Sequence, residues 1–312
     1  EFDWFDKTTT GILRQVQIPQ QVGNLTGPVR NVGKVQNKGY EITLNWRDKI
    51  GKVNYNIGGN LTRVDNKVLN TGGQQIINGN RVIFEGYPID SYLGLRAMGY
   101  FQTADEIKSA PFQNAVQSPG DIRYKDLNGD NKIDSQDREI IGNTIPKYTY
   151  SITLGADFKG FDFSMFFQGV QGLQNYVNAN LGFPYRNGAG VTKEWLTETW
   201  TPENPTSDLP RYMWANYGRN YQTAGGAGTD PANFWEKGDY LMLREITLSY
   251  DVPGKILTSH LKDRIRGIKV YVAGSNLLYV TKYTGTFPEV GGLDNGKYPL
   301  PRTVTFGLNV TL

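Results

Sequence analysis

Hydrophobic and polar residues alternate along several stretches of the chain, and the final ten residues show this most clearly. In "TVTFGLNVTL", one face carries Val304, Phe306, Leu308, Val310 and Leu312, while the other carries Thr, Gly and Asn residues. A β-strand turns successive side chains to opposite faces, so this pattern predicts a strand with one apolar face. The stretch therefore predicts a strand in a half-buried or membrane-embedded sheet.

The same period of two recurs in "YEITLNWR", "VNYNIGGNL", "YTYSITLGADF" and "FDFSMFFQ". In "YLMLREITLSY" the phase breaks near Arg244 and Glu245, which predicts a β-bulge there. Two further candidate strands, at Asn80–Glu85 and Ile89–Gln102, satisfy the parity of the tight turns described below. With them the sequence predicts ten strands, at Phe2–Thr8, Gly33–Arg47, Lys52–Asp65, Asn80–Glu85, Ile89–Gln102, Lys147–Phe158, Phe161–Gln171, Asp239–Asp251, Gly267–Val280 and Arg302–Leu312.

Strand length and aromatic placement distinguish a membrane barrel from a soluble sandwich, which would also alternate. Sandwich strands are commonly about five or six residues long, whereas a strand that crosses a bilayer needs roughly nine to eleven. Several of the expected strands are of the longer kind. Aromatic residues bracket their ends, as interfacial girdles do: Tyr40 and Trp46, Tyr148 and Phe158, Phe161 and Phe167.

Short and long connections alternate along the chain. Tight hairpins are expected around Lys49–Gly51 and at Lys159 and Gly160. Long segments are expected at Thr9–Val32, Thr103–Pro146, Gly172–Gly238 and Lys282–Pro301. Outer-membrane barrels have short periplasmic turns and long external loops, and an even number of strands must separate two turns on one side. The sequence thus predicts an all-β fold, a transmembrane antiparallel β-barrel with long extracellular loops.

Composition excludes several other classes. The 312 residues carry a net charge of only +3, which does not indicate a nucleic-acid surface, and no cysteine, which excludes a disulfide scaffold. No apolar run is long enough for a membrane-spanning helix, and the mean hydropathy of −0.48 suits a soluble β-protein or a barrel equally. The chain opens "EFDWFDKTTT", already alternating and without a signal peptide, so we expect it to be a segment of a longer protein.

The segment "DLNGDNKIDSQD", residues 126–137, has the ligand spacing of an EF-hand-like calcium loop. Oxygen donors occupy positions one, three, five, seven, nine and twelve, and Ca²⁺ requires six to eight oxygens. The donors are the side chains of Asp126, Asn128, Asp130, Asp134 and Asp137 and the backbone carbonyl of Lys132. Position six holds Asn131 in place of Gly, and Asn also tolerates a positive φ.

An accidental cluster of turn residues is the alternative interpretation of this loop. Amphipathic helices flank an EF-hand, but "GDIRYK" and "REIIGNTIP" do not supply them. We therefore expect a structural calcium ion that rigidifies an extracellular loop, and no signalling role.

No catalytic arrangement emerges, and the chain is not expected to be an enzyme or to bind an organic cofactor. The single histidine, His260, lies in an expected periplasmic connection, and Glu194 and Glu198 form an ordinary solvated helix face. The glycine-rich Ala224–Thr229 lacks the strand, Lys and helix of a phosphate loop. A secreted, calcium-stabilised, β-rich glycan-binding module is the alternative to a barrel.

The chain also resembles a known family. The stretch "GDIRYKDLNGDNKIDSQDREIIGNTIPKYTYSITLGADFKGFDFSMFFQGVQG" is similar to SusC/RagA-type TonB-dependent transporters of the Bacteroidetes outer membrane. Further matches are "TTTGILRQVQIP", "VQNKGYEITLNW", "LTETWTPENPTSDLPR", "NFWEKGDYLMLREITLSYDVP", "VYVAGSNLLYVTKYTGTFPEV" and "YPLPRTVTFGLNVTL".

The resemblance implies that residues 1–312 form the C-terminal portion of the family's 22-stranded barrel, about ten strands, with the N-terminal plug and TonB box absent from this chain. It implies a cell outer-membrane importer of glycans or oligopeptides, driven through TonB. The implied partner is a SusD-like surface lipoprotein, and a dimer of transporter–lipoprotein pairs is the assembly that the resemblance suggests.

Of the implied site residues, only the calcium-like loop maps onto named positions, and the substrate-binding residues stay open. Aromatic residues of the outer segments could stack on sugars or pack against one another, and packing is the preferred interpretation. These residues are Tyr176, Phe183, Tyr185, Trp195, Trp200, Tyr212, Trp214, Tyr217 and Trp235.

Overall fold

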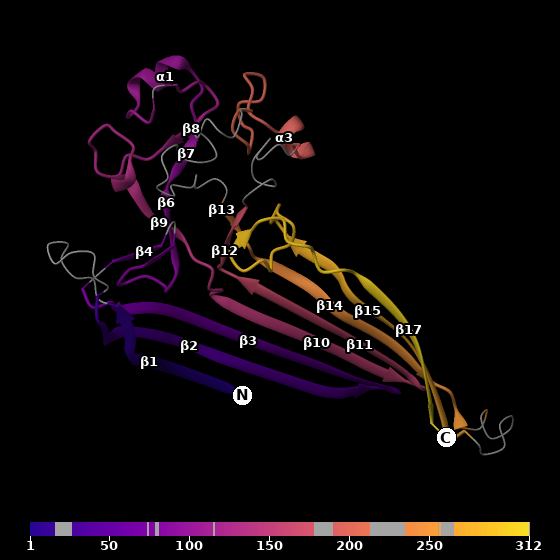
Figure 1. The fold of residues 1–312 in the computed structure, drawn as a ribbon. Helices are drawn as coiled ribbons and strands as arrows, with labels where there is room; N and C mark the ends of the chain where they lie inside the picture. The colour runs from indigo at the N-terminus through magenta and orange to yellow at the C-terminus, as the bar shows by residue number, and fades with distance from the viewer. Residues whose placement is uncertain are drawn as a thin grey trace.

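A single long antiparallel sheet dominates the computed structural model, which describes residues 1–15, 27–73, 75–78, 81–114, 116–177, 190–212, 235–254, 256 and 265–311. This sheet, the wall, has the order β1-β2-β3-β10-β11-β14-β15-β17, so neighbours along the chain are neighbours in space (Figure 1). Its strands are β1 (Phe2–Gln15), β2 (Val29–Ile50), β3 (Val53–Asn70), β10 (Tyr148–Phe158), β11 (Phe161–Gln171), β14 (Tyr240–Asp251), β15 (Gly267–Thr281) and β17 (Thr303–Thr311). This meander confirms the predicted all-β antiparallel architecture.

Two tight turns join wall strands at the same end of the sheet (Figure 1). Gly51, with φ +60°, lies between β2 and β3. Lys159 and Gly160, with φ of 48° and 89°, join β10 to β11, and two consecutive positive φ values match the twist of a two-residue hairpin. Both predicted hairpins are therefore confirmed, and they lie on one side of the wall, as predicted.

The prediction of two further wall strands, at Asn80–Glu85 and Ile89–Gln102, is wrong. β3 pairs directly with β10, and Val64 N donates to Lys147 O at 3.0 Å where the two meet. The first segment contributes only β5 (Arg81–Ile83), and the second divides into β6 (Ser91–Leu95) and β7 (Ala97–Tyr100). All five residues of β6 are buried, so its alternation serves a small packed sheet, which sequence pattern alone does not distinguish from a wall strand.

The predicted loop at Thr9–Val32 is also shorter than expected. β1 continues to Gln15 and β2 begins at Val29, and the two strands pair through this region with register shifts between Thr9 and Leu13. Bulges allow pairing to continue where strict alternation fails, and strict alternation was the basis of the prediction.

The segments that leave the wall at the end opposite the tight turns form an outer assembly of small elements (Figure 1). A four-stranded sheet has the order β4-β5-β6-β9, a two-stranded sheet pairs β7 with β8, and a three-stranded sheet has the order β13-β12-β16. The elements not yet given bounds are β4 (Ile76–Asn78), α1 (Ala104–Ser109), β8 (Ile122–Tyr124), the 3-10 helix η2 (Ser135–Asp137), β9 (Arg138–Gly142), β12 (Gln174–Val177), α3 (Lys193–Thr197), β13 (Trp235–Lys237) and β16 (Leu293–Asp294).

The wall register aligns the apolar residues of neighbouring strands on one face. Trp46 lies opposite Ile57, Ile57 opposite Leu154, and Leu154 opposite Met165. Directly opposed residues share a face, so these rows form a continuous apolar surface. Three residues further along the strands, and so on the other face, the row Thr43–Asn60–Ser151–Gln168 carries polar side chains.

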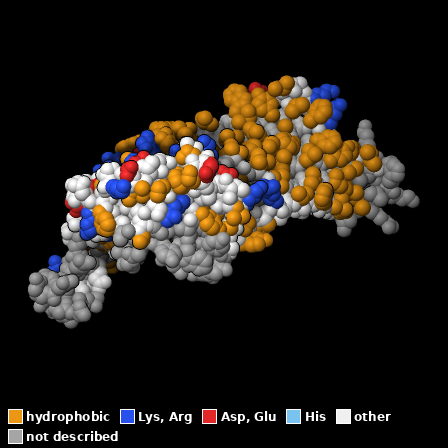
Figure 2. Space-filling view, turned by 90° about the horizontal axis from the view of Figure 1, so that it is seen from above, with side chains coloured by type: hydrophobic (Ala, Val, Ile, Leu, Met, Phe, Trp, Pro, Cys, Tyr) orange, Lys and Arg blue, Asp and Glu red, His pale blue; other side chains and the backbone are white. Residues whose placement is uncertain are grey.

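The apolar face stays open to the surroundings. The solvent-exposed fractions of Trp4, Trp46 and Phe306 are 67%, 60% and 80%. Figure 2 shows hydrophobic side chains gathered over part of the molecule, with charged side chains mixed among polar ones elsewhere. Eight antiparallel strands with one apolar and one polar face are the wall of a transmembrane barrel. No helix among the described residues is long and apolar enough to cross a membrane.

Candidate functional site

The EF-hand-like loop lies in the outer assembly, between β8 and β9. Its sixth residue, Asn131, has φ +63°, which confirms that Asn takes the left-handed conformation at the position where Gly is usual. The Asp126 carboxylate accepts hydrogen bonds from Gly129 N at 2.7 Å and from Asn131 N at 2.9 Å. The side chain at the first position thus closes the loop by accepting hydrogen bonds from backbone N–H groups three and five residues further on.

The third and fifth positions make the same kind of contact. Asn128 Oδ1 accepts from Asp130 N, and Asp130 Oδ1 accepts from Lys132 N, both at 2.9 Å. Short polar side chains that bind backbone N–H groups two residues on produce a series of tight turns. The result is the coiled backbone that a calcium loop requires.

The last positions of the loop are held more firmly. Asp137 is only 1% exposed, and its two oxygens accept from Leu127 N at 2.9 Å and Asp134 N at 2.7 Å. Asp134 accepts from Gln136 N and lies 2.9 Å from Lys132 Nζ. The Gln136 N–H and, next, Lys132 lower the pKa of the Asp134 carboxyl, and the hydrogen bond to Asp134 raises the pKa of Lys132.

These residues fit a hard cation in part. Carboxylate oxygens accept more than one bond, so the oxygens of Asp126, Asn128 and Asp130 retain capacity for Ca²⁺ beside their backbone contacts. The Asp137 oxygens point to backbone N–H groups, and Asp134 pairs with Lys132. Within the described ranges, no three His, Cys, Asp or Glu side chains are grouped as a metal site. To bind Ca²⁺, the Asp134 carboxylate would have to release Lys132 Nζ.

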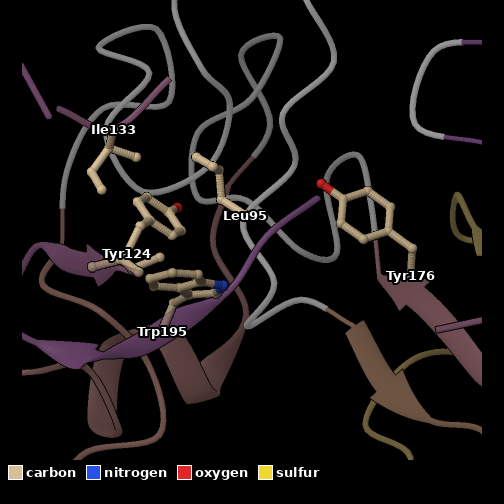
Figure 3. Packing of buried hydrophobic residues seen from close by; sticks show 6 residues of the cluster. Leu95, Tyr124, Ile133, Tyr176 and Trp195 are labelled. Carbon is tan, nitrogen blue, oxygen red and sulfur yellow. The ribbon is translucent and has the colours of Figure 1, made fainter. Parts of the chain in front are cut away.

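The calcium-like loop is joined to a packed cluster. Phe112 N donates to Asn131 O at 2.8 Å, and Ile133 N donates to Phe112 O at 2.9 Å. Ile133 belongs to a buried cluster with Leu95, Tyr124 and Trp195 (Figure 3). An ordered loop therefore fixes one side of the hydrophobic core of the outer assembly.

The described aromatic residues of the outer segments pack against protein. Tyr176, Trp195 and Trp200 are 2%, 3% and 7% exposed, as the packing interpretation predicts. Tyr212 and Trp235 lie half-buried against the same cluster. Phe183, Tyr185, Trp214 and Tyr217 lie outside the described residues.

An aromatic stack links two of the small sheets. The Trp235 ring lies 3.6 Å from the Tyr92 ring and 4.7 Å from the Tyr176 ring, between centroids. Burial raises the pKa of Tyr92 to about 12, and the Arg81 guanidinium over its ring opposes that rise. Because the three rings cover one another, this stack is a structural contact between β6, β12 and β13.

A polar network lies on the polar face of the wall, which is the inner face of a barrel. The sequence predicts only the bulge at which this network forms. Register shifts between Leu243 and Glu245 leave Arg244 unpaired in the ladder, which confirms the predicted bulge. Arg244 donates to Gln168 Oε1 at 2.9 and 3.1 Å and to Glu289 Oε2 at 2.7 Å. The Tyr279 hydroxyl donates to Glu289 Oε1 at 2.6 Å.

The network ties the loop after β15 to the wall. Glu289 belongs to residues 282–302, which join β15 to β17, so this loop folds back along the inner face. In a barrel, the inner face borders the passage that a solute takes. The loop is therefore attached to the polar face of the wall through Arg244 and Glu289.

Two buried polar residues order the same loop, Asn175 from β12 and Asp294 from within the loop. Asn175 Nδ2 donates to Pro288 O at 2.7 Å, and its Oδ1 accepts from Gly292 N at 3.0 Å. Asp294, fully buried, accepts from the Tyr283 hydroxyl at 2.8 Å and from Thr286 N at 2.7 Å. Burial and the adjacent Asp294 raise the pKa of Tyr283. Satisfied buried polar groups of this kind specify a single loop conformation.

The residues considered for catalysis form no reaction centre in the described structure. Glu194 belongs to α3 and Glu198 ends it, where Glu198 N donates to Glu194 O at 2.7 Å. His260 and Ala224–Thr229 lie outside the described residues.

The wall and its outer assembly define the class of the chain, which is a segment of an outer-membrane-type barrel. No family model matches the chain. Among curated proteins, it is 31% identical to TonB-dependent receptor P26 of Formosa agariphila, over 100% of this chain and 32% of the receptor. It is 25% identical to TonB-dependent receptor SusC of Bacteroides thetaiotaomicron, over 99% of this chain and 29% of SusC.

Solved structures share the fold. The chain superposes on the RagAB peptide importer in its 'open-open' state with a TM-score of 0.78 and 22% identity, covering 100% of this chain and 32% of that one. For the RagAB peptide transporter the TM-score is 0.76, with 21% identity, and the shares covered are 99% and 32%. The chain is thus homologous along its whole length to SusC-type TonB-dependent receptors, and it spans about a third of the curated relatives it matches. These relatives are named as receptors and transporters, and none is named as an enzyme.

Proposed function

We propose that this chain supplies part of the wall and outer mouth of a SusC-like, TonB-dependent importer in the outer membrane. The observation that carries the proposal is the continuous apolar face of the eight-stranded wall, with tight turns at one end and long, structured loops at the other. A soluble calcium-stabilised module would have to cover that face, which includes Trp4 and Phe306.

The proposed importer works with partners that lie outside this chain. A SusD-like lipoprotein meets the outer assembly, and TonB acts through a plug contributed by another part of the complete protein. The substrate is an oligosaccharide or an oligopeptide: the family resemblance implies both classes, and the name of the similar RagAB peptide transporter supports the second.

Uptake by source cells tests this function. Cells with and without the gene for the complete protein would receive a fluorescent oligosaccharide pool and, separately, a fluorescent oligopeptide pool, with and without an uncoupler. We expect uncoupler-sensitive accumulation of one pool only in cells that carry the gene. Recovery of the complete protein from the soluble secreted fraction would reject the importer and favour the secreted module.

We also propose that Ca²⁺ binds the loop at 126–137 as a structural ion. Its support is the coiled backbone, with Asn131 at φ +63° and the side chains of Asp126 and Asp130 bound to it. Calorimetric titration of the complete protein with Ca²⁺ should show one site that an Asp126→Asn, Asp130→Asn double variant loses. A matched Asp105→Asn variant on α1 should retain it, and equal titrations of all three proteins would contradict the calcium site.

A further inference from the structure

Charged residues gather on the apolar side of the wall, at the end that carries the outer assembly. We call them the rim cluster: Lys38, Arg63, Lys67, Lys147, Asp6 and Asp65. Its members lie on β1, β2 and β3, and Lys147 comes immediately before β10, so three neighbouring wall strands and the start of a fourth contribute. It contains four cations and two carboxylates and therefore carries a net positive charge.

The register places the cluster directly beyond an aromatic row. Trp4 lies opposite Tyr40, Tyr40 opposite Arg63, and Arg63 opposite Tyr148. Two residues further along the strands, Asp6 lies opposite Lys38, and Lys38 opposite Asp65. Two residues advance a strand by about 6.8 Å, so these charges lie just beyond the aromatic girdle, at the depth of lipid headgroups.

The intervening residues show that the cluster points away from the protein. Val68 is 1% exposed, and Asn66 Oδ1 accepts from Ile89 N of the outer assembly at 2.7 Å. Lys67 lies between them in the strand and is exposed, so it faces the opposite side. Lys38 likewise keeps half of its side-chain exposure.

The cluster retains positive charge and donors that protein groups do not use. Lys38 pairs with Asp6 at 3.2 Å, while Arg63 at 2.8 Å and Lys147 at 3.7 Å share Asp65. Lys67 has no ion pair with another described residue, whereas the unpaired Arg63 Nε is buried and is not open to a ligand. Two carboxylates therefore face four cations at the membrane surface.

We propose that the rim cluster binds the phosphate of an anionic lipid headgroup in the outer leaflet. Guanidinium and ammonium groups donate charge-assisted hydrogen bonds to phosphate oxygens, and basic groups next to an apolar surface attract anionic lipids. Tyr40 and Tyr148 border the acyl chains while the cations hold the headgroup. The inference rests on the proposed function, because it requires the wall to lie in the outer membrane.

Native mass spectrometry of the complete, detergent-solubilised protein tests the proposal. Phosphatidylglycerol would be titrated against phosphatidylcholine, and inorganic phosphate would be added as a competitor. We expect the parent to retain phosphatidylglycerol preferentially and a Lys38→Gln, Lys67→Gln double variant to lose about tenfold in affinity, since each cation near an anionic surface contributes. A Lys108→Gln, Lys193→Gln variant, changed at two exposed lysines of the outer assembly, serves as the matched control and should bind like the parent.

The outcomes separate this proposal from the importer itself. Equal lipid binding by the double variant, or displacement of the lipid by millimolar inorganic phosphate, would overturn the headgroup site. The headgroup site would also be overturned if the double variant lost a co-purifying acidic protein that the parent binds, and lost no lipid. Absence of the parent from the outer-membrane fraction would instead reject the proposed function. An unchanged heat-induced shift in gel mobility would show that the double variant folds.

Discussion

Arg244 and Glu289 join the wall to the loop between β15 and β17, with Nη2 and Oε2 2.7 Å apart. The side chains are 24% and 22% exposed, so both charges are largely withdrawn from water. A charge at such a position is stable only while its partner and hydrogen bonds are present.

We expect Arg244→Met to release this loop. The change leaves Glu289 with only the Tyr279 hydroxyl, and an unpaired, partly buried group of this kind costs about 1–3 kcal/mol. Tryptic cleavage after Lys297, in the same loop, should therefore become faster than in the parent. Arg302→Met, at an exposed position before β17, is the control, and equal cleavage rates in all three proteins would contradict the attachment.

Leu308→Arg tests which face of the wall meets lipid. Leu308 lies opposite Val270 on the apolar face, and an Arg at the bilayer midplane of a barrel costs about 2–4 kcal/mol. We expect a lower yield of membrane-inserted, heat-modifiable protein. Asn309→Arg places the same charge on the polar face and should insert normally. Equal insertion of Leu308→Arg and the parent would remove the lipid-facing assignment.

Asp137→Asn should loosen the calcium-like loop even without calcium. The buried carboxylate accepts from Leu127 N and Asp134 N, and an amide can accept only one of these bonds. The orphaned N–H should cost about 1–3 kcal/mol. Hydrogen exchange at the Leu127 and Asp134 amides would report the change, with Asp105→Asn, at an exposed site, as the control. Unchanged protection would show that Asp137 does not hold the loop.

The loop should also respond to acid through Asp134. Its folded-state pKa is lowered, so the stabilisation it gives is present above the unfolded value of about 3.8 and is lost as the pH falls through the folded value. Protection of the Gln136 amide, which donates to Asp134 Oδ1, should fall in that acidic range after correction for intrinsic exchange. In Asp134→Asn, the same amide should show no such transition. A transition that persists in this variant would assign it to another group.

The wall was largely predictable because its strands obey one simple rule. Residues 148–158 and 161–171 were predicted within a residue of their observed bounds, since lipid and lumen impose opposite polarity at every step. The main error came from the parity of the tight turns, which any even number of intervening strands satisfies and which was met by adding two strands where the wall has none. β6 alternates for a different reason, in a small sheet buried on both faces, and no local signal separates the two cases.

The attachments of the outer loops were not predictable from the pattern. Asn175 and Asp294 look like ordinary turn residues in the sequence, yet both are fully buried. Asn175 bonds to Pro288 and Gly292, far along the chain, whereas Asp294 bonds within its own loop to Tyr283 and Thr286. Contacts between loops depend on where the wall strands place the ends of each loop, which local sequence does not encode. The local turn chemistry of Asn131, in contrast, was predictable because its positive φ follows from a short-range ligand spacing.

The parallel pairing of β12 with β16 has a consequence for exchanging parts between related proteins. Tyr176 pairs with Leu293, and Asn175 binds the backbone just before that contact, at Pro288 and Gly292. If only the β12 segment or only the loop between β15 and β17 were transferred to a related protein, it would lose these contacts with the other segment. Chimeras should therefore carry both segments from the same parent, and natural diversification of this mouth should have changed the two together.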